Sequence, residues 1–246
     1  ADMEAIREIA DKHNLFIIED NAQAMGATYT DKDGRKQKTG TLGHVSATSF
    51  FPSKNLGCYG DGGAICTDDD DLAHIIRGIV NHGMYKRYHH DVVGVNSRLD
   101  SIQAAVLNAK LPNLDEYNNR RRAAARKYSQ GLKGVANILT PKVVGHEGEI
   151  TENCDNHVFH QYTVRILNGK RDALMQHLME NNVPFGVYYP IPLHRQKAYA
   201  DSRYDESDFE VTNQLVKEVI SLPMHTELED SQIDFIVDLV KDFVNN

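Results

Sequence analysis

The 246-residue sequence has no tryptophan, only three cysteines and no long apolar run. Cys58, Cys66 and Cys154 are odd in number and form no C-x-x-C pair, so we expect neither a disulfide framework nor a metal site of the zinc type. Cysteine usage this sparse fits the reducing cytoplasm. No apolar stretch approaches the roughly 18 residues that a transmembrane helix needs, and no signal peptide is visible. We therefore expect a cytoplasmic protein without a membrane partner.

Positive charge is also scarce. Lysine and arginine total 27 against 35 aspartates and glutamates, which gives a formal net charge of −8. A nucleic-acid backbone requires a basic face, so nucleic acid is not expected as a partner. A small anionic substrate stays open, because one local arginine can hold it. The hydrophobic fraction of 41% and the charged fraction of 25% are typical of globular proteins, so a folded core is expected.

The first half of the chain has an α/β pattern. A helical repeat at residues 1–13 precedes a continuous apolar run at 15–18, which is typical of a buried parallel strand and is followed by Glu19 and Asp20. Ligands collect at the carboxyl ends of such strands. Further strands are predicted at 44–51 and 64–66, on either side of a glycine-rich loop.

The second half of the chain has a different pattern of predicted helices and strands. Helices are predicted at 99–110 and 114–132, separated by Pro112. After residue 131 the pattern predicts short strands and amphipathic helices in turn, with strands at 161–167 and 183–190 and helices at 171–182, 208–220 and 231–243. This change predicts a small α+β domain after a larger α/β one.

Lys54 and Asp20 are the first candidates for chemistry. Lys54 lies in S-F-F-P-S-K-N-L-G, between a predicted strand and the glycine-rich loop. A nucleophilic lysine must be partly desolvated, and a strand end offers that, although an ordinary surface lysine is the simpler interpretation of the spacing alone. Asp20 ends a predicted buried strand, where a carboxylate needs a partner. A pyridinium nitrogen, an arginine or a helix N-terminus would each serve.

Two other motifs are set aside. The run G-C-Y-G-D-G-G leads into an extended segment instead of opening a helix, so it is not a dinucleotide-binding fingerprint. His82, His89 and His90 lack carboxylates or cysteines at ligand spacing, so no metal is expected there.

Five segments follow one another along the chain in this order: EDNAQAMGA, SFFPSKNLGCYGDGGAI, GVNSRLDSIQAAVLNAKL, GVYYPIPLH and SLPMH. Together they resemble the DegT/DnrJ/EryC1/StrS aminotransferases, which attach amino groups to nucleotide-linked keto sugars. The resemblance covers almost the whole chain, and E-D-x-A-Q with S-F-x-x-x-K-N-L-G is a highly specific pair. It implies the aspartate aminotransferase type I fold of pyridoxal-phosphate (PLP) enzymes. Residues 1–112 would be the C-terminal part of the cofactor-binding large domain, and 113–246 a linker helix with a small C-terminal α+β domain.

The resemblance implies roles for five residues at the cofactor. Lys54 would form the Schiff base with pyridoxal 5′-phosphate. Asp20 would pair with the pyridine nitrogen and keep it protonated, so that the ring can accept electrons. Ala22 would pack on the ring, Gln23 would reach the phenolic oxygen, and Ser49 would bind the phosphate.

The same resemblance extends to substrate and partners. Asn96 of G-x-N-x-R would reach the phosphate of a neighbouring subunit, which implies a homodimer with shared active sites. Arg98, Tyr188 and His194 are the substrate candidates, and Arg98 could pair with an anionic sugar or nucleotide. The implied reaction moves an amino group from L-glutamate to a nucleotide-linked keto sugar, possibly a 3-keto sugar, with Lys54 as general acid and base.

Family members carry a substantial segment before the point where this chain begins, and that segment supplies a helix N-terminus for the phosphate. Cofactor binding is therefore expected to depend on it. Two alternatives stay open: an aminotransferase of a cyclitol or aromatic-precursor pathway, and a truncated, non-catalytic sensor or structural relative. A related dehydratase that uses pyridoxamine phosphate carries histidine in place of the lysine, so Lys54 argues against it.

Overall fold

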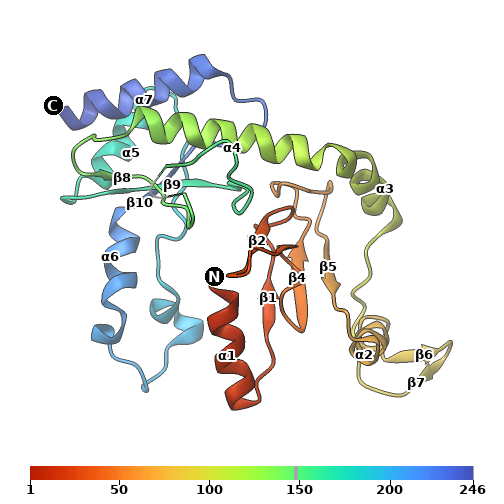
Figure 1. The fold of residues 1–246 in the computed structure, drawn as a ribbon. Coiled ribbons are helices and arrows are strands. Elements are labelled where there is room, and N and C mark those ends of the chain that lie inside the picture. Colours follow the sequence, from red (N-terminus) through yellow and green to blue (C-terminus); the bar gives the residue numbers. More distant parts are fainter. Residues whose placement is uncertain (147–148, 246) are drawn as a thin grey trace. The chain divides into compact units, whose positions relative to one another are not determined.

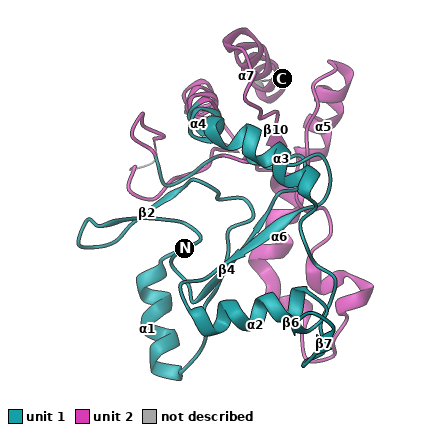
Figure 2. Ribbon diagram, turned by 90° about the vertical axis from the view of Figure 1, so that its right-hand side faces the viewer, with its two compact units in different colours: residues 1–119, 155–158 teal, residues 120–154, 159–246 magenta. Residues whose placement is uncertain are grey.

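The computed structural model describes residues 1–146 and 149–245. The chain divides into two compact units, shown in teal and magenta in Figure 2. Unit 1 comprises residues 1–119 and 155–158, and unit 2 comprises residues 120–154 and 159–246.

Unit 1 is built on a three-stranded sheet with the order β1-β4-β5 (Figure 1). Strand β1 (Ile18–Asp20) pairs in parallel with β4 (Val45–Ser49), and β5 (Gly63–Cys66) pairs antiparallel with β4. The parallel pairing means that β1 and β4 end at the same edge of the sheet. The predicted strands at 44–51 and 64–66 are confirmed by β4 and β5.

The remaining elements of unit 1 are mostly short. They are α1 (Met3–His13), the β2–β3 hairpin (Thr28–Thr30 and Lys36–Lys38), α2 (Asp70–Val80), the β6–β7 hairpin (Met84–Lys86 and His89–His90), α3 (Ser101–Lys110) and the 3-10 helix η1 (Leu111–Asn113). Helix α4 (Leu114–Gly131) begins in unit 1 and ends in unit 2. The starts of α1 and α2 are fixed by aspartate caps: Asp2 accepts from Ala5 N at 3.1 Å and Asp69 from Leu72 N at 2.9 Å.

One prediction for unit 1 is wrong. The strand expected at 15–18 begins only at Ile18, and the side chains of Leu15, Phe16 and Ile18 are 56%, 84% and 73% exposed. A continuous apolar run implies burial only when other elements cover both faces of the strand. Here β1 is an outer strand of the described sheet, and these side chains face solvent. Asp20 is likewise exposed, so the argument that burial forces a partner on its carboxylate does not hold.

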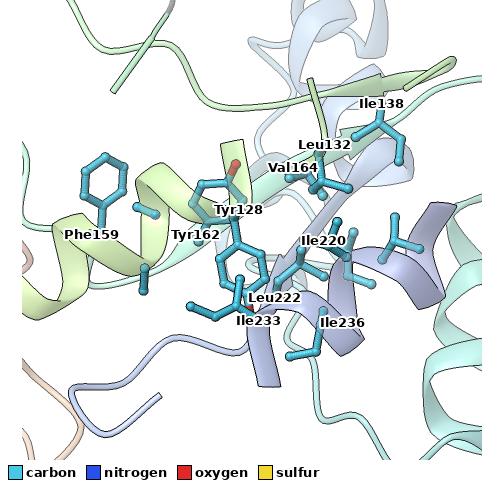
Figure 3. Packing of buried hydrophobic residues seen from close by; sticks show 14 of the residues in the cluster. Tyr128, Leu132, Ile138, Phe159, Tyr162, Val164, Ile220, Leu222, Ile233 and Ile236 are labelled. Carbon is cyan, nitrogen blue, oxygen red and sulfur yellow. The ribbon is translucent and has the colours of Figure 1, made fainter. Parts of the chain in front are cut away.

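Unit 2 contains a second three-stranded sheet with the order β10-β9-β8, all antiparallel. Its strands are β8 (Ile138–Leu139), β9 (Tyr162–Ile166) and β10 (Val219–Leu222), and its helices are the second part of α4, α5 (Arg171–Glu180), α6 (Glu210–Glu218), α7 (Asp230–Asn245) and the 3-10 turns η2 (Leu193–Arg195), η3 (Lys197–Tyr199) and η4 (Glu206–Phe209). Alternate residues of β9 are buried, as expected for a strand with one face on a core. That core includes Tyr128 of α4 and Tyr162 of β9, whose rings stack at 5.0 Å (Figure 3).

One prediction for unit 2 is wrong, and another is confirmed except at its C-terminal end. The segment 183–190 does not form a strand, since only Gly186 makes an isolated bridge, to Ser221. Conversely, the helix predicted at 208–220 ends at Glu218, and the chain continues as β10. Tertiary pairing decides both segments: residues 219–222 pair with β9, whereas residues 183–190 meet β10 only through the bridge from Gly186 to Ser221.

Candidate active site

The carboxyl ends of β1 and β4 bring the first two motifs together. The register places Asp20 beside Ala47, so Ser49 lies two residues further along β4, at the edge of the sheet. The chain that follows β1 stays against β4: Asn21 N donates to Ala47 O at 2.8 Å, and Thr48 Oγ1 donates to Asn21 O at 3.2 Å. The E-D-x-A-Q motif therefore turns over the end of the strand that leads to Lys54.

Glu19 and Asp20 are consecutive strand residues, so their side chains leave opposite faces of the sheet. The Glu19 carboxylate accepts three backbone N–H groups, from Gly40 at 2.6 Å, Leu42 at 2.9 Å and Gly43 at 3.3 Å. It thereby ties the loop before β4 to β1. Asp20 instead accepts from Ala22 N at 3.0 Å, which shapes the turn after β1. Sequence reasoning missed Glu19, although its place before a candidate aspartate was visible.

Lys54 lies in a closed loop at the end of β4. Phe51 N donates to Ser49 Oγ at 3.2 Å, and Lys54 N donates to Phe51 O at 2.8 Å. A Cβ atom at Gly57 would lie 2.5 Å from Pro52 O and 2.7 Å from Phe51 O, so the loop folds back on itself where only glycine fits. The Lys54 side chain is half-buried. Such a loop holds the lysine at the sheet edge without enclosing it.

Ala22 and Gln23 follow the β1 end, where Ala22 is half-buried and Gln23 is exposed. Asn96 and Arg98 occupy a different place in unit 1. Arg98 Nε donates to Asn96 Oδ1 at 3.1 Å, and both residues are exposed.

The pair Asn96–Arg98 lines a cavity of about 860 Å³ that also includes Thr48 of β4 and Arg77 of α2. Within unit 1, which the structure describes completely, this lining contains neither Asp20 nor Lys54. The cavity is therefore a neighbour of the β4 strand and not part of the lysine loop. The lining contains two arginines, Arg77 and Arg98, and two aspartates, Asp61 and Asp100, so an anionic group would have to bind directly beside the arginines.

Tyr188 and His194 belong to unit 2. Tyr188 is exposed and lies edge-on to Tyr189, with ring centroids 5.8 Å apart. His194 stacks on Phe209 at 4.1 Å, with its Nε2 3.3 Å from Glu206 Oε2. These contacts give His194 a local packing role in unit 2.

Comparison with known proteins decides the family. Residues 1–241 match the DegT/DnrJ/EryC1/StrS aminotransferase family. The chain belongs to this family.

Similar proteins include a pleiotropic regulatory protein of Geobacillus stearothermophilus, 44% identical over 99% of this chain and 62% of its own length. A UDP-2-acetamido-2-deoxy-3-oxo-D-glucuronate aminotransferase of Pseudomonas aeruginosa is 44% identical over 96% of this chain and 60% of its own. The crystal structure of DesV from S. venezuelae in complex with a ketimine intermediate has a TM-score of 0.89 and 40% identity, covering 100% of this chain and 62% of that one. This member of the family thus spans under two thirds of the length of these relatives.

The chemistry of the donor set fits PLP, the cofactor of the family's aminotransferases. At one sheet edge the chain presents an amine (Lys54), a carboxylate (Asp20), an amide (Gln23) and a hydroxyl (Ser49). These groups complement the aldehyde, the pyridine nitrogen, the phenolic oxygen and the phosphate of that cofactor.

Among the described residues, histidine, cysteine, aspartate and glutamate side chains do not gather into a group of three that could hold a metal ion. In the same part of the chain, no helix combines the length and the apolar character that crossing a bilayer demands.

Proposed function

We propose that this protein is a PLP-dependent aminotransferase that moves an amino group from L-glutamate to a nucleotide-linked keto sugar. The single observation that carries the proposal is the shared end of β1 and β4, where Asp20, Ser49 and the closed loop of Lys54 meet. The P. aeruginosa relative, whose name specifies a 3-oxo sugar linked to UDP, supports a 3-keto substrate.

Each motif residue then has a defined role. When bound, the cofactor supplies an electron sink for the carbon that exchanges its amino group. Lys54 would hold the cofactor and carry a proton on Nζ as general acid and base. Asp20 would keep the proton on the pyridine nitrogen, and Ala22 would pack against the ring. Gln23 would donate to the phenolic oxygen and Ser49 to the phosphate.

The substrate and partner assignments belong to the same proposal. Arg98, with Arg77 in the same cavity lining, would attract the anionic nucleotide part, and Tyr188 and His194 would contact the sugar. Asn96 would reach the phosphate bound by a second copy in a homodimer with shared sites. Exposed apolar side chains near Asn96, such as Val93 and Ile102, support such a partner surface.

The domain assignment is part of the proposal too. Residues 1–112 would belong to the large cofactor domain, and residues 113–246 would form the linker helix and the small α+β domain. The three cysteines, none of them in a disulfide, support a cytoplasmic protein.

Reductive trapping tests the cofactor and its anchor. The protein, produced from its complete gene so that any residues preceding Ala1 are present, is incubated with PLP, reduced with borohydride and mapped by peptide mass spectrometry. We expect a pyridoxyl adduct on the Lys54 peptide that is lost in Lys54→Arg and kept in the control Lys32→Arg, a change at an exposed hairpin lysine. Adducts spread evenly over surface lysines would contradict the proposal.

A second candidate, a regulatory relative, is favoured by the name of the G. stearothermophilus protein. Amino transfer separates the two. An aminotransferase converts glutamate to 2-oxoglutarate in the presence of a nucleotide-linked 3-keto sugar, or of a cyclitol or aromatic-precursor ketone if the alternative pathway applies. A non-catalytic regulatory relative would form no 2-oxoglutarate with any of these acceptors, and failure to bind PLP would also favour it.

A further inference from the structure

The residue after Lys54 is anchored by a helix far along the chain. Asn55 Nδ2 donates to Asn118 Oδ1 at 2.7 Å and to Val158 O at 3.0 Å. Asn118 is 0% exposed and lies in the first turns of α4. Its Nδ2 donates to Met25 O at 3.0 Å, in the segment that follows Asp20. A single buried amide therefore connects the lysine loop to the aspartate turn.

The same loop is held at two more points by α3. Lys110 Nζ donates to Gly57 O at 2.7 Å and lies 5.0 Å from the centroid of the Tyr59 ring. Tyr59 N donates to Gln103 Oε1 at 2.8 Å. Gln103 and Lys110 are seven residues apart, two turns of α3, so they share one face of that helix. Figure 1 shows the loop between β4 and β5 running up to the junction of α3 and α4.

The bonds follow an alternating pattern along the loop. Asn55, Gly57 and Tyr59 are bonded to the helices, whereas Leu56 and Cys58 between them are buried in the small core of unit 1. Every residue from 55 to 59 is therefore either hydrogen-bonded to a helix or buried in the core. A shift of this segment along its own direction would break both kinds of contact. We call the contacts of Gln103, Lys110 and Asn118 with this loop the helix ladder.

We propose that the helix ladder positions Lys54, so that Gln103, Lys110 and Asn118 are positioning residues of the reaction. This inference rests on the proposed function and deepens it. Lys54 directly precedes Asn55, the first loop residue that the helix ladder binds, and Asn118 also binds the turn after Asp20. The helix ladder therefore fixes the amine of Lys54 relative to the carboxylate of Asp20. Misplacement of a reacting group by about 1 Å costs on the order of a hundredfold in rate, so such fixing matters.

Substitutions can remove or keep the ladder contacts of Gln103 and Lys110 one at a time. Gln103→Leu removes the acceptor for Tyr59 N, whereas Gln103→Glu keeps it. Lys110→Met removes the donor to Gly57 O, whereas Lys110→Arg keeps a donor. Asn108→Leu is the matched control, because Asn108 is exposed and lies about 140° around α3 from Gln103.

Two readouts with opposite signs make the test specific. Without PLP, reductive methylation by formaldehyde and cyanoborohydride, quantified peptide by peptide, reports how freely Lys54 Nζ meets a small aldehyde. We expect Gln103→Leu and Lys110→Met to raise the Lys54 rate severalfold while the exposed Lys12 and Lys217 stay at their wild-type rates. With PLP, we expect the same variants to trap cofactor at Lys54 about tenfold more slowly. Gln103→Glu, Lys110→Arg and Asn108→Leu should stay within about twofold of wild type in both assays.

Each other result overturns the inference. Equal methylation of Lys54 in all variants would mean that the ladder does not hold it. A higher methylation rate at every lysine would mean that Gln103 and Lys110 only stabilise the fold. If the wild-type protein traps no PLP at Lys54, the proposed function fails, and the methylation arm still decides whether the ladder holds the amine.

Discussion

Asn118 Nδ2 lies 2.6 Å from the position that a Cβ atom would take at Gly26, whose φ is +88°. The same amide donates to Met25 O, so it cannot move away without breaking that bond. Gly26→Ala should therefore combine a backbone penalty of about 1–2 kcal/mol with an overpacking penalty of about 1–3 kcal/mol. Gly34 is the matched control, with φ +81° and no atom within 4 Å of the added Cβ. Urea unfolding should show a clearly larger loss for Gly26→Ala, and equal losses would refute the steric argument.

Glu19 should matter more for stability than its half-exposed position suggests. Glu19→Ala removes a charged acceptor from the backbone N–H groups of Gly40, Leu42 and Gly43, and we expect a loss of about 2–4 kcal/mol. Glu19→Gln keeps one acceptor oxygen and should lose about half as much. Glu8→Gln on the exposed face of α1 serves as the control and should change stability by less than about 0.5 kcal/mol. A Glu19→Ala protein as stable as that control would contradict the prediction.

Alkaline pH should destabilise unit 2 through two tyrosines. Burial, with a smaller contribution from Tyr162, raises the pKa of Tyr128, and burial raises the pKa of Tyr162, both well above the usual value near 10. The folded state then keeps its phenol protons while the unfolded state releases them. Stability is therefore unaffected below about pH 10 and falls above it, by up to about 1.4 kcal/mol per pH unit for each tyrosine.

Urea unfolding from pH 8 to pH 11 checks this slope. Tyr128→Phe should flatten it, while costing about 1 kcal/mol at neutral pH because the hydroxyl donates to Pro223 O at 3.0 Å. Tyr204→Phe, at an exposed site, should leave the slope unchanged. A slope identical in all three proteins would show that the Tyr128 phenol does not contribute to it.

The core of unit 2 provides a direct measure of packing. Leu178 is fully buried at the end of α5, whereas the next residue, Met179, is exposed. Leu178→Ala should cost about 2–5 kcal/mol through lost contacts and the cavity left behind. Met179→Ala should cost less than about 1 kcal/mol. Thermal unfolding followed by circular dichroism would contradict the assignment of the core if the two variants melted together.

The roles of the site residues were predicted from the resemblance carried by E-D-x-A-Q and S-F-x-x-x-K-N-L-G, and they stay predictions. An apolar run that ends in acids predicts a ligand-binding strand end, and the parallel pairing of β1 with β4 agrees with it. Glu19 and the helix ladder could not be found this way. Gln103 and Asn118 are polar residues on helices, where a pattern predicts only a solvated face, and their partners lie 44 and 63 positions away in the chain.

The errors in the fold have the same origin. The pattern of residues 208–220 is compatible with a helix up to its last residue, and only pairing with β9 makes residues 219–222 a strand. Residues 183–190 have the composition of a strand, but composition alone does not provide a partner edge. Local propensity is decided there by tertiary contacts that no short window contains.

Glycine-rich loops are usually the places where proteins gain and lose residues during evolution. The loop after Lys54 should be an exception, because its bonded and buried residues alternate one by one. Inserting or deleting a single residue between positions 55 and 59 would exchange the two sets, directing Leu56 and Cys58 to the helices and polar groups into the core. Side-chain exchanges around this loop should therefore be better tolerated than any change in its length.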